Sequence, residues 1–215
     1  MEIQNKLIPK TFYWMFLGLL GTAIVSWYTY ESGLYLKILL SNSFSILLIA
    51  EIIVVLLFSF LFRKLPATLV AILYFIYSMI NGVSISLIFV IFELSSVIYL
   101  FIASALLFGC LALYGYKTEN DLSNWRTILF GTLIIGLILS IINLFIGNSI
   151  LDIILDWVIL ATFCGITIYD MNKIKQLQYE EDLQQDKLHI YGAMQLYLDF
   201  INIFLRILSI FGKRK

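Results

Sequence analysis

The stretch FSILLIAEIIVVLLFSFLF, residues 44–62, holds one charged side chain, Glu51, among nineteen residues. An α-helix needs about 20 mostly apolar residues to cross the hydrocarbon core of a bilayer. The segment has that length and composition, so it predicts a transmembrane helix. Its single acid lies where an ionised carboxylate without a partner is costly, which makes that acid a candidate functional residue.

The composition of the whole chain also indicates a protein that lies in a lipid bilayer. Of its 215 residues, 61% are hydrophobic and only 13% are charged, and the mean hydropathy is +0.97. The polar residues are too few to cover a water-exposed surface, so we expect an all-α integral membrane protein in contact with the lipid bilayer. The 14 basic and 14 acidic residues balance, so nothing in the charge favours a nucleic-acid partner.

Seven segments are long and apolar enough to span a membrane, and short polar connections separate most of them. The prediction is one transmembrane domain over residues 1–215, built as a bundle of seven helices. The predicted helices lie at about 11–30, 44–62, 67–92, 95–114, 127–146, 151–172 and 190–211.

The placement of lysine and arginine orients the predicted bundle, because short loops rich in positive charge stay in the cytoplasm. We expect a cytoplasmic N-terminus, since the opposite loops then carry only Lys37. The basic tail after residue 211 departs from this pattern, so the last segment either crosses fully, as its length favours, or turns back. The basic residues of the cytoplasmic face are then Lys6, Lys10, Arg63, Lys64, Lys117, Arg126, Lys173, Lys175 and Lys187.

The N-terminal helix and the composition also bear on location. No small-residue cleavage site accompanies the first apolar run, which favours a retained helix over a signal peptide. The high content of Ile, Lys, Asn and Phe favours a bacterial plasma membrane, with an intracellular eukaryotic membrane as the alternative.

Three acids lie inside predicted spans, namely Glu51, Asp170 and Asp199. Ionisable groups at such depth usually face the interior of a bundle and belong to an ion path, a proton relay or a counter-ion. The alternative is that they serve only as hydrogen-bonding contacts between helices.

Chain direction brings two of these acids together. The sixth and seventh predicted helices are antiparallel, so Asp170 and Asp199 approach a similar depth from opposite directions. Two carboxylates about 4 Å apart repel by roughly 4 kcal/mol at an effective dielectric constant of about 20. We therefore expect the pair to share a proton at mildly acidic pH and to repel at higher pH, which predicts a pH-dependent switch.

The side chains around this pair indicate which ion it would handle. Asp170, Asp199, Asn172, Asn202 and Tyr169 supply hard oxygen ligands, whereas thiol and imidazole groups are scarce. Such oxygen ligands suit Ca²⁺ or protons better than soft metals. The sequence thus favours Ca²⁺ as a transported ion held at Asp170 and Asp199, with Asn172 and Asn202 along its path, and no permanently bound cofactor.

Two motifs in the last two spans resemble a known family. The pattern GITIYDxxxI at residues 165–174, followed by LYLDFINIFxxxL at residues 196–208, closely resembles the signature of the Bax inhibitor-1 (transmembrane Bax inhibitor motif) family, and the chain length resembles its bacterial members. The resemblance implies seven helices, with the last between two three-helix layers, and a pH-sensitive calcium leak channel. It further implies Asp170 and Asp199 as the proton-sensing pair, Arg63 as a latch to that pair, and Glu51 along the ion path.

Three other functions remain as alternatives. A cation/proton exchanger could use the same acid pair, and a non-conducting regulator of cell-death or stress partners could use the polar linker 173–188 and the basic tail. An intramembrane aspartyl protease is the rival of a different class, because it also uses two aspartates on neighbouring helices. It resembles this chain less, since the glycine-rich and proline-containing motifs of those proteases are missing, and we therefore expect no enzyme.

Overall fold

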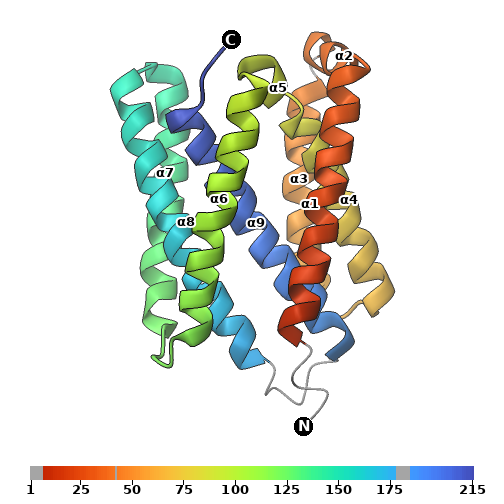
Figure 1. The fold of residues 1–215 in the computed structure, drawn as a ribbon, viewed down its shortest axis with the longest axis vertical. Helices are drawn as coiled ribbons and strands as arrows, with labels where there is room; N and C mark the ends of the chain where they lie inside the picture. The colour runs from red at the N-terminus through yellow and green to blue at the C-terminus, as the bar shows by residue number, and fades with distance from the viewer. Residues whose placement is uncertain (1–6, 42, 178–184) are drawn as a thin grey trace. The chain divides into compact units, whose positions relative to one another are not determined.

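The computed structural model describes residues 7–41, 43–177 and 185–215, and this part of the chain is built from α-helices without β-strands (Figure 1). The helices are α1 (Leu7–Glu31), α2 (Leu34–Leu40), α3 (Ser43–Leu61), α4 (Ala67–Ile85), α5 (Ile88–Ile91), α6 (Leu94–Lys117), α7 (Ser123–Ile146), α8 (Ser149–Leu177) and α9 (Gln185–Phe211).

Seven helical segments are long and apolar enough to cross a membrane, which confirms the predicted fold class of an all-α membrane protein. Each one covers a predicted segment with ends that differ by a few residues, and α4 and α5 together form the third. The polar linker predicted at 173–188 lies partly outside the described residues. The spans are Leu7–Glu31, Ser43–Leu61, Ala67–Ile91, Leu94–Lys117, Ser123–Ile146, Ser149–Leu177 and Lys187–Phe211.

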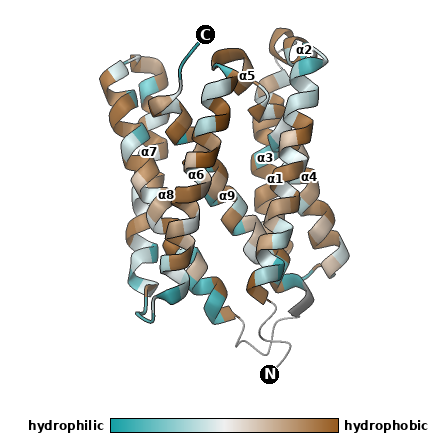
Figure 2. Cartoon of the chain, in the orientation of Figure 1, coloured by the Kyte–Doolittle hydropathy of each residue, from teal (hydrophilic) through white to brown (hydrophobic). Residues whose placement is uncertain are grey.

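The spans differ in how much of their surface other parts of the protein cover. In an apolar stretch of 18 residues from each span, 6% of the residues are buried in α3 and 56% in α9, the largest share of the seven. Apolar residues cover the middle of the helices and hydrophilic residues gather near their ends, as at the α6–α7 connection (Figure 2). This pattern fits helices whose exposed sides face lipid, because a lipid-facing surface needs no polar cover.

The first compact unit (unit 1) comprises the described parts of residues 1–93 and 177–197, together with Lys215. It contains α1 to α5 and the beginning of α9, and α1 packs along α4 (Figure 1). The approach of these two helices is close, because a Cβ atom added at Gly82 would lie 2.8 Å from the carbonyl oxygen of Thr22. Small residues allow such contact between membrane helices, which draw little driving force from the hydrophobic effect.

The second compact unit (unit 2) comprises residues 94–176 and 198–214, which form α6, α7, nearly all of α8 and the end of α9. Phe200 of α9 makes edge-on contacts with Phe101 and Phe108 of α6, with ring centroids 5.2 and 5.7 Å away. The backbones of α6 and α8 meet at Gly115, where a Cβ atom would clash with the carbonyl of Ile168. This contact sets the position of the α8 segment that carries Asp170.

Each end of α9 is held by hydrogen bonds within its own unit. In unit 1, the buried Lys187 ammonium donates to the carbonyls of Leu65 at 2.7 Å and Arg63 at 3.3 Å, in the α3–α4 connection. In unit 2, the backbone N–H of Lys213 donates to the hydroxyl of Ser96, at the start of α6, at 3.0 Å.

Candidate ion-path site

The two predicted aspartates lie together in unit 2. Asp170 of α8 and Asp199 of α9 are only 6% and 2% exposed, and their carboxyl groups are close enough to repel each other when both are ionised. The hydroxyl of Thr167, one turn before Asp170, lies beside Asp199 and donates its proton to the carbonyl of Phe163 at 2.8 Å. The oxygen of Thr167 is therefore available to accept a hydrogen bond from a neutral Asp199 carboxyl.

Asp199 contains a polar atom that the surrounding helices do not satisfy. Its Oδ2 is buried and has no hydrogen-bond partner among the described residues. Burying a carboxylate oxygen without a partner is costly, so such an atom usually binds a proton, water or an ion. The arrangement suits a group that exchanges protons or cations during function.

Two cationic groups in unit 2 act electrostatically on Asp170, namely Lys173 on the same helix and Arg126 of α7. Both lie toward the end of the span where α8 finishes and α7 begins. Arg63, which the family resemblance suggests as the latch, has an exposed side chain and belongs to unit 1. The latch role of Arg63 therefore stays a prediction, and Lys173 and Arg126 are cations that the sequence motifs did not indicate.

The two asparagines predicted along the ion path make local contacts. Asn172 is buried and donates from Nδ2 to the carbonyls of Thr118 at 3.0 Å and Gly115 at 3.4 Å, which ties α8 to the end of α6. Its Oδ1 accepts a hydrogen bond from Gln176 at 2.9 Å. Asn202 donates to the carbonyl of Leu198, one turn earlier on α9, at 2.8 Å. Their part in ion transfer stays a prediction.

The third predicted acid, Glu51, lies in unit 1 within a cluster of polar side chains. Its Oε1 is buried and has no hydrogen-bond partner among the described residues, and the side chains of Asn81 and Ser84 of α4 lie close to the carboxyl group. The fully buried hydroxyl of Tyr197 donates to Oδ1 of Asn81 at 2.9 Å and lies 2.6 Å from the hydroxyl of Thr22. Unit 1 therefore has its own membrane-buried polar network, which joins α1, α4 and α9.

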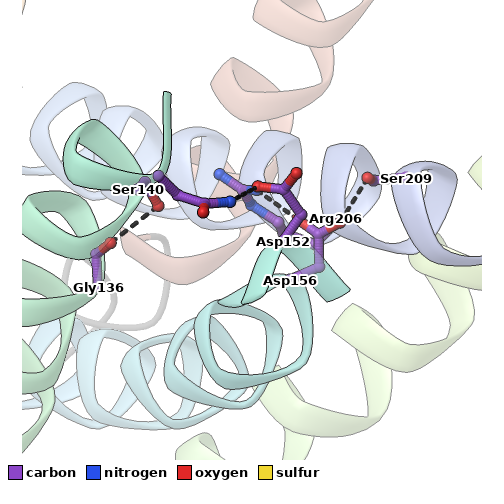
Figure 3. Close-up of polar contacts among 7 residues, drawn as sticks. Gly136, Ser140, Asp152, Asp156, Arg206 and Ser209 are labelled. Carbon is purple, nitrogen blue, oxygen red and sulfur yellow. Dashed lines mark hydrogen bonds and ion pairs between the residues drawn. The ribbon is translucent and has the colours of Figure 1, made fainter. Parts of the chain in front are cut away.

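A further polar cluster in unit 2 was not indicated by the sequence motifs. Arg206 of α9 forms an ion pair with Asp156 of α8, with 2.5 Å between Nη1 and Oδ1, and the hydroxyl of Ser209 donates to Oδ2 of the same carboxylate at 2.5 Å (Figure 3). One turn earlier on α8, Asp152 accepts a hydrogen bond from Asn143 of α7 at 2.5 Å. Asp152 and Asp156 lie near the start of α8, where charged residues usually face water, yet the side chain of Asp156 is only 13% exposed.

The acids of the candidate site do not form a typical metal centre. Within residues 7–41, 43–177 and 185–215, no three histidine, cysteine or acidic side chains lie close enough together to hold a metal ion. Asp170 and Asp199 offer two carboxylates, so a cation held there would take its remaining ligands from water, hydroxyl groups or carbonyl groups.

Seven membrane-length helices with a pair of buried aspartates define a class of polytopic membrane protein that has a protonatable site within its spans. Comparison with known proteins agrees with the two motifs. The family described as "Inhibitor of apoptosis-promoting Bax1" matches residues 4–215, so the chain belongs to the Bax inhibitor-1 family.

Relatives of the chain are found in several bacteria. The inner membrane protein YbhL of Escherichia coli is 35% identical over 214 residues, which cover 97% of this chain and 92% of that protein. An uncharacterised protein of Borreliella burgdorferi is 31% identical over 219 residues, covering 99% and 94% of the two chains. An uncharacterised membrane protein of Streptococcus pyogenes serotype M1 is 35% identical over 167 residues, covering 77% and 72%.

Proposed function

We propose that this Bax inhibitor-1 family protein is a pH-sensitive calcium leak channel, in which Ca²⁺ moves down its gradient past a protonatable pair formed by Asp170 and Asp199. The observation that carries the proposal is the burial of both carboxyl groups in one unit, with Oδ2 of Asp199 left without a partner among the described residues. An acid that served only as a contact between helices would be expected to have its hydrogen bonds satisfied.

The mechanism follows from the charge of the pair. When one proton is bound, a carboxyl and a carboxylate can hydrogen-bond to each other, which holds α8 against α9. When that proton leaves, the two carboxylates repel, and a cation lying between them becomes favourable. Protons and Ca²⁺ then compete for the same two groups, so the occupancy of the site by Ca²⁺ depends on pH.

The proposal extends to location and chemistry. The cytoplasmic N-terminus expected from the basic residues would place the α3–α4 connection on the inner face of a bacterial plasma membrane. Ca²⁺ and protons are the proposed partners, with no resident cofactor and no enzymatic reaction. Glu51 is proposed to lie along the ion path, and Arg63 keeps its proposed role as a latch.

The test is Ca²⁺ influx into dye-loaded proteoliposomes, measured between about pH 5 and pH 8, a range in which a perturbed carboxyl pair titrates. We expect the wild-type flux to change with pH and the pH dependence to flatten in Asp170→Asn and in Asp199→Asn. Glu119→Gln is the matched control, because it neutralises an exposed acid in the α6–α7 connection.

Two outcomes would contradict the proposal. Wild-type vesicles without Ca²⁺ flux would exclude a channel, and a full pH response in both aspartate variants would exclude the pair as its sensor. Proton movement recorded in the same vesicles separates a leak from an exchanger, because an exchanger moves protons in a fixed ratio to Ca²⁺.

A further inference from the structure

The ion pair of Asp156 and Arg206 lines a cavity of about 540 Å³ in unit 2. The cavity lies between the end of α7, the start of α8 and the end of α9. Its charged lining consists of Asp152, Asp156, Arg206 and Arg214, joined by serine hydroxyls from all three helices. The cavity has room for many water molecules, each of which occupies about 30 Å³ in the liquid, so a hydrated ion fits inside it.

Stabilisation alone gives a weak reason for an ion pair at this place. Asp156 has both carboxylate oxygens occupied, and the Asp156 and Arg206 side chains are 13% and 33% exposed. For such partly buried pairs the loss of hydration offsets most of the electrostatic attraction, and apolar side chains of similar size often serve as well or better. The pair therefore calls for an explanation beyond packing.

The ion pair shares its helix faces with the aspartate pair. Asp156 and Asp170 lie 14 residues apart on α8, and Arg206 and Asp199 lie seven residues apart on α9. At about 100° per residue these spacings bring the side chains back to within roughly 40° and 20° of the same direction. Both pairs thus lie along one seam between α8 and α9, with Arg206 about 10 Å beyond Asp199 along α9 and Asp156 about 21 Å from Asp170 along α8.

A second observation in the same seam also indicates a ligand. Oδ2 of Asp199 is buried without a partner among the described residues, on the α9 face that carries Arg206 two turns later. A polar atom of this kind needs a proton, water or a cation, and the cavity is the polar space that adjoins this seam. The two features lie at two levels of one seam, and the buried residues Phe163 of α8 and Ile203 of α9 lie between those levels in the sequence.

We propose that this cavity is a mouth of the cation path and that Arg206 is its gate. While the path is closed, the guanidinium group of Arg206 binds Asp156. A divalent cation that enters the cavity binds Asp152 and Asp156 and displaces the guanidinium group. This inference rests on the proposed function, because it assigns a port and a gate to the same cation path.

The chemistry of arginine separates this gate from the aspartate pair. A guanidinium group keeps its charge throughout the physiological pH range, whereas the mechanism proposed for the aspartate pair depends on a proton. The other charged residues that line the cavity are Asp152, Asp156 and Arg214, and its polar residues are Ser140, Ser149 and Ser209. The gate therefore sets how much Ca²⁺ flows at every pH, whereas the aspartate pair sets how the flow changes with pH.

The first test measures Ca²⁺ flux in proteoliposomes that contain Arg206→Gln. Removing one charged competitor from a partly exposed site is expected to raise the flux about fivefold at every pH, with the wild-type pH profile retained. Asp156→Asn is expected to lower the flux by a similar factor, and the double variant is expected to behave like Asp156→Asn. Lys37→Gln, which removes an exposed positive charge elsewhere, is the control.

The second test measures binding without transport. Tb³⁺ is a luminescent substitute for Ca²⁺ that is excited through a nearby tryptophan, and Trp157 follows Asp156 directly and packs on Phe211 with ring centroids 5.7 Å apart. We expect Arg206→Gln to tighten Tb³⁺ binding about fivefold and Asp152→Asn or Asp156→Asn to weaken it. Trp157→Phe should remove the luminescence that comes from this cavity.

The two readouts distinguish the failure of the gate from the failure of the channel. If wild-type protein conducts Ca²⁺ but neither flux nor Tb³⁺ binding changes in Arg206→Gln, the gate is overturned and the channel stands. If wild-type protein does not conduct Ca²⁺ but Arg206→Gln still tightens Tb³⁺ binding, the cation site stands and the channel is overturned. Thermal unfolding of each variant in detergent establishes that the folded protein is being compared.

Discussion

The two carboxylate sites of unit 2 lie on the same two helices and differ in how their charge is balanced. Asp156 has an arginine and a serine hydroxyl on its two oxygens, whereas Asp199 faces another aspartate and leaves Oδ2 without a partner among the described residues. The Asp156 carboxylate therefore has a cationic partner within the protein. A carboxyl that is paired with another acid depends on a proton that comes and goes.

From this difference we expect the Asp156 site to stabilise the fold and the Asp199 site to make the protein respond to pH. Neutralising Asp156 leaves a partly buried guanidinium without its partner, so the fold should suffer. Neutralising Asp199 removes the repulsion within the aspartate pair, so the fold should tolerate it while the pH response disappears. The predictions below test this contrast, in order of decreasing effect on stability.

The largest loss of stability is expected for Asp156→Ala. Removing one partner of a fully buried ion pair costs about 3–5 kcal/mol and of an exposed pair at most about 1 kcal/mol, so this partly exposed pair should lose about 2–3 kcal/mol. Thermal unfolding in detergent measures the loss. Replacing both Asp156 and Arg206 by apolar residues should recover much of it, and a double variant as unstable as Asp156→Ala would show that the unpaired charge is not the cause.

A loss of about 2 kcal/mol is expected for Gly115→Ala, because the new methyl group would clash with the backbone carbonyl of Ile168 and push α8 away from α6. The matched control is Gly109→Ala on the same helix, where a Cβ atom meets no other atom within 4 Å and should stabilise the helix slightly. Equal unfolding temperatures for the two variants would contradict the close contact between α6 and α8. The displacement should also alter the pH response, since Asp170 lies two residues beyond Ile168.

A smaller loss of about 1 kcal/mol is expected for Tyr197→Phe, which removes a buried hydroxyl that bonds to Asn81 and lies beside Thr22 in unit 1. Because Tyr197 lies two residues before Asp199, this variant tests whether any lost polar contact on α9 changes the pH response. Unfolding and Ca²⁺ flux should be measured together. We expect an unchanged pH profile, and a flattened profile would mean that the response does not belong to the aspartates alone.

The smallest effect on stability, within about 1 kcal/mol of wild type, is expected for Asp199→Asn, because the amide resembles the protonated carboxyl in shape and removes a charge that Asp170 repels. Its effect on function should be the largest of the set, with the pH dependence of Ca²⁺ flux lost. A strong fall in unfolding temperature would indicate that Asp199 has a structural role like that of Asp156.

Much of this protein was predictable from sequence, because the bilayer imposes a simple local requirement. A run of about 20 apolar residues such as 44–62 forms a spanning helix whatever its neighbours are, since its backbone must satisfy its own hydrogen bonds in lipid. Glu51, Asp170 and Asp199 are noticeable for the same reason, because a charge inside such a run is exceptional. The motifs around Asp170 and Asp199 also predicted the family to which the chain belongs.

The contacts between helices could not be predicted from the sequence in the same way. Helices in lipid are apolar on nearly every side, so the sequence does not reveal which face turns inward as it does for an amphipathic helix in water. Arg206 and Asp156 are 50 residues apart and lie near span ends, where charged residues are ordinary. The spacings of seven and 14 residues from Asp199 and Asp170 are the signal that could have linked them.

The sequence by itself determined that the helices lie in lipid, where the seven spans fall and which acids lie within them. Each of these depends on the hydropathy of a continuous segment. Only the tertiary structure decided which polar side chains contact each other. Asp156 pairs with Arg206, Asn172 bonds to the end of α6, and Tyr197 contacts Thr22 and Asn81. Such pairings depend on how each helix is rotated and how closely it approaches its neighbours. Contacts such as that between Gly115 and Ile168 set both quantities, through residues far apart in the chain.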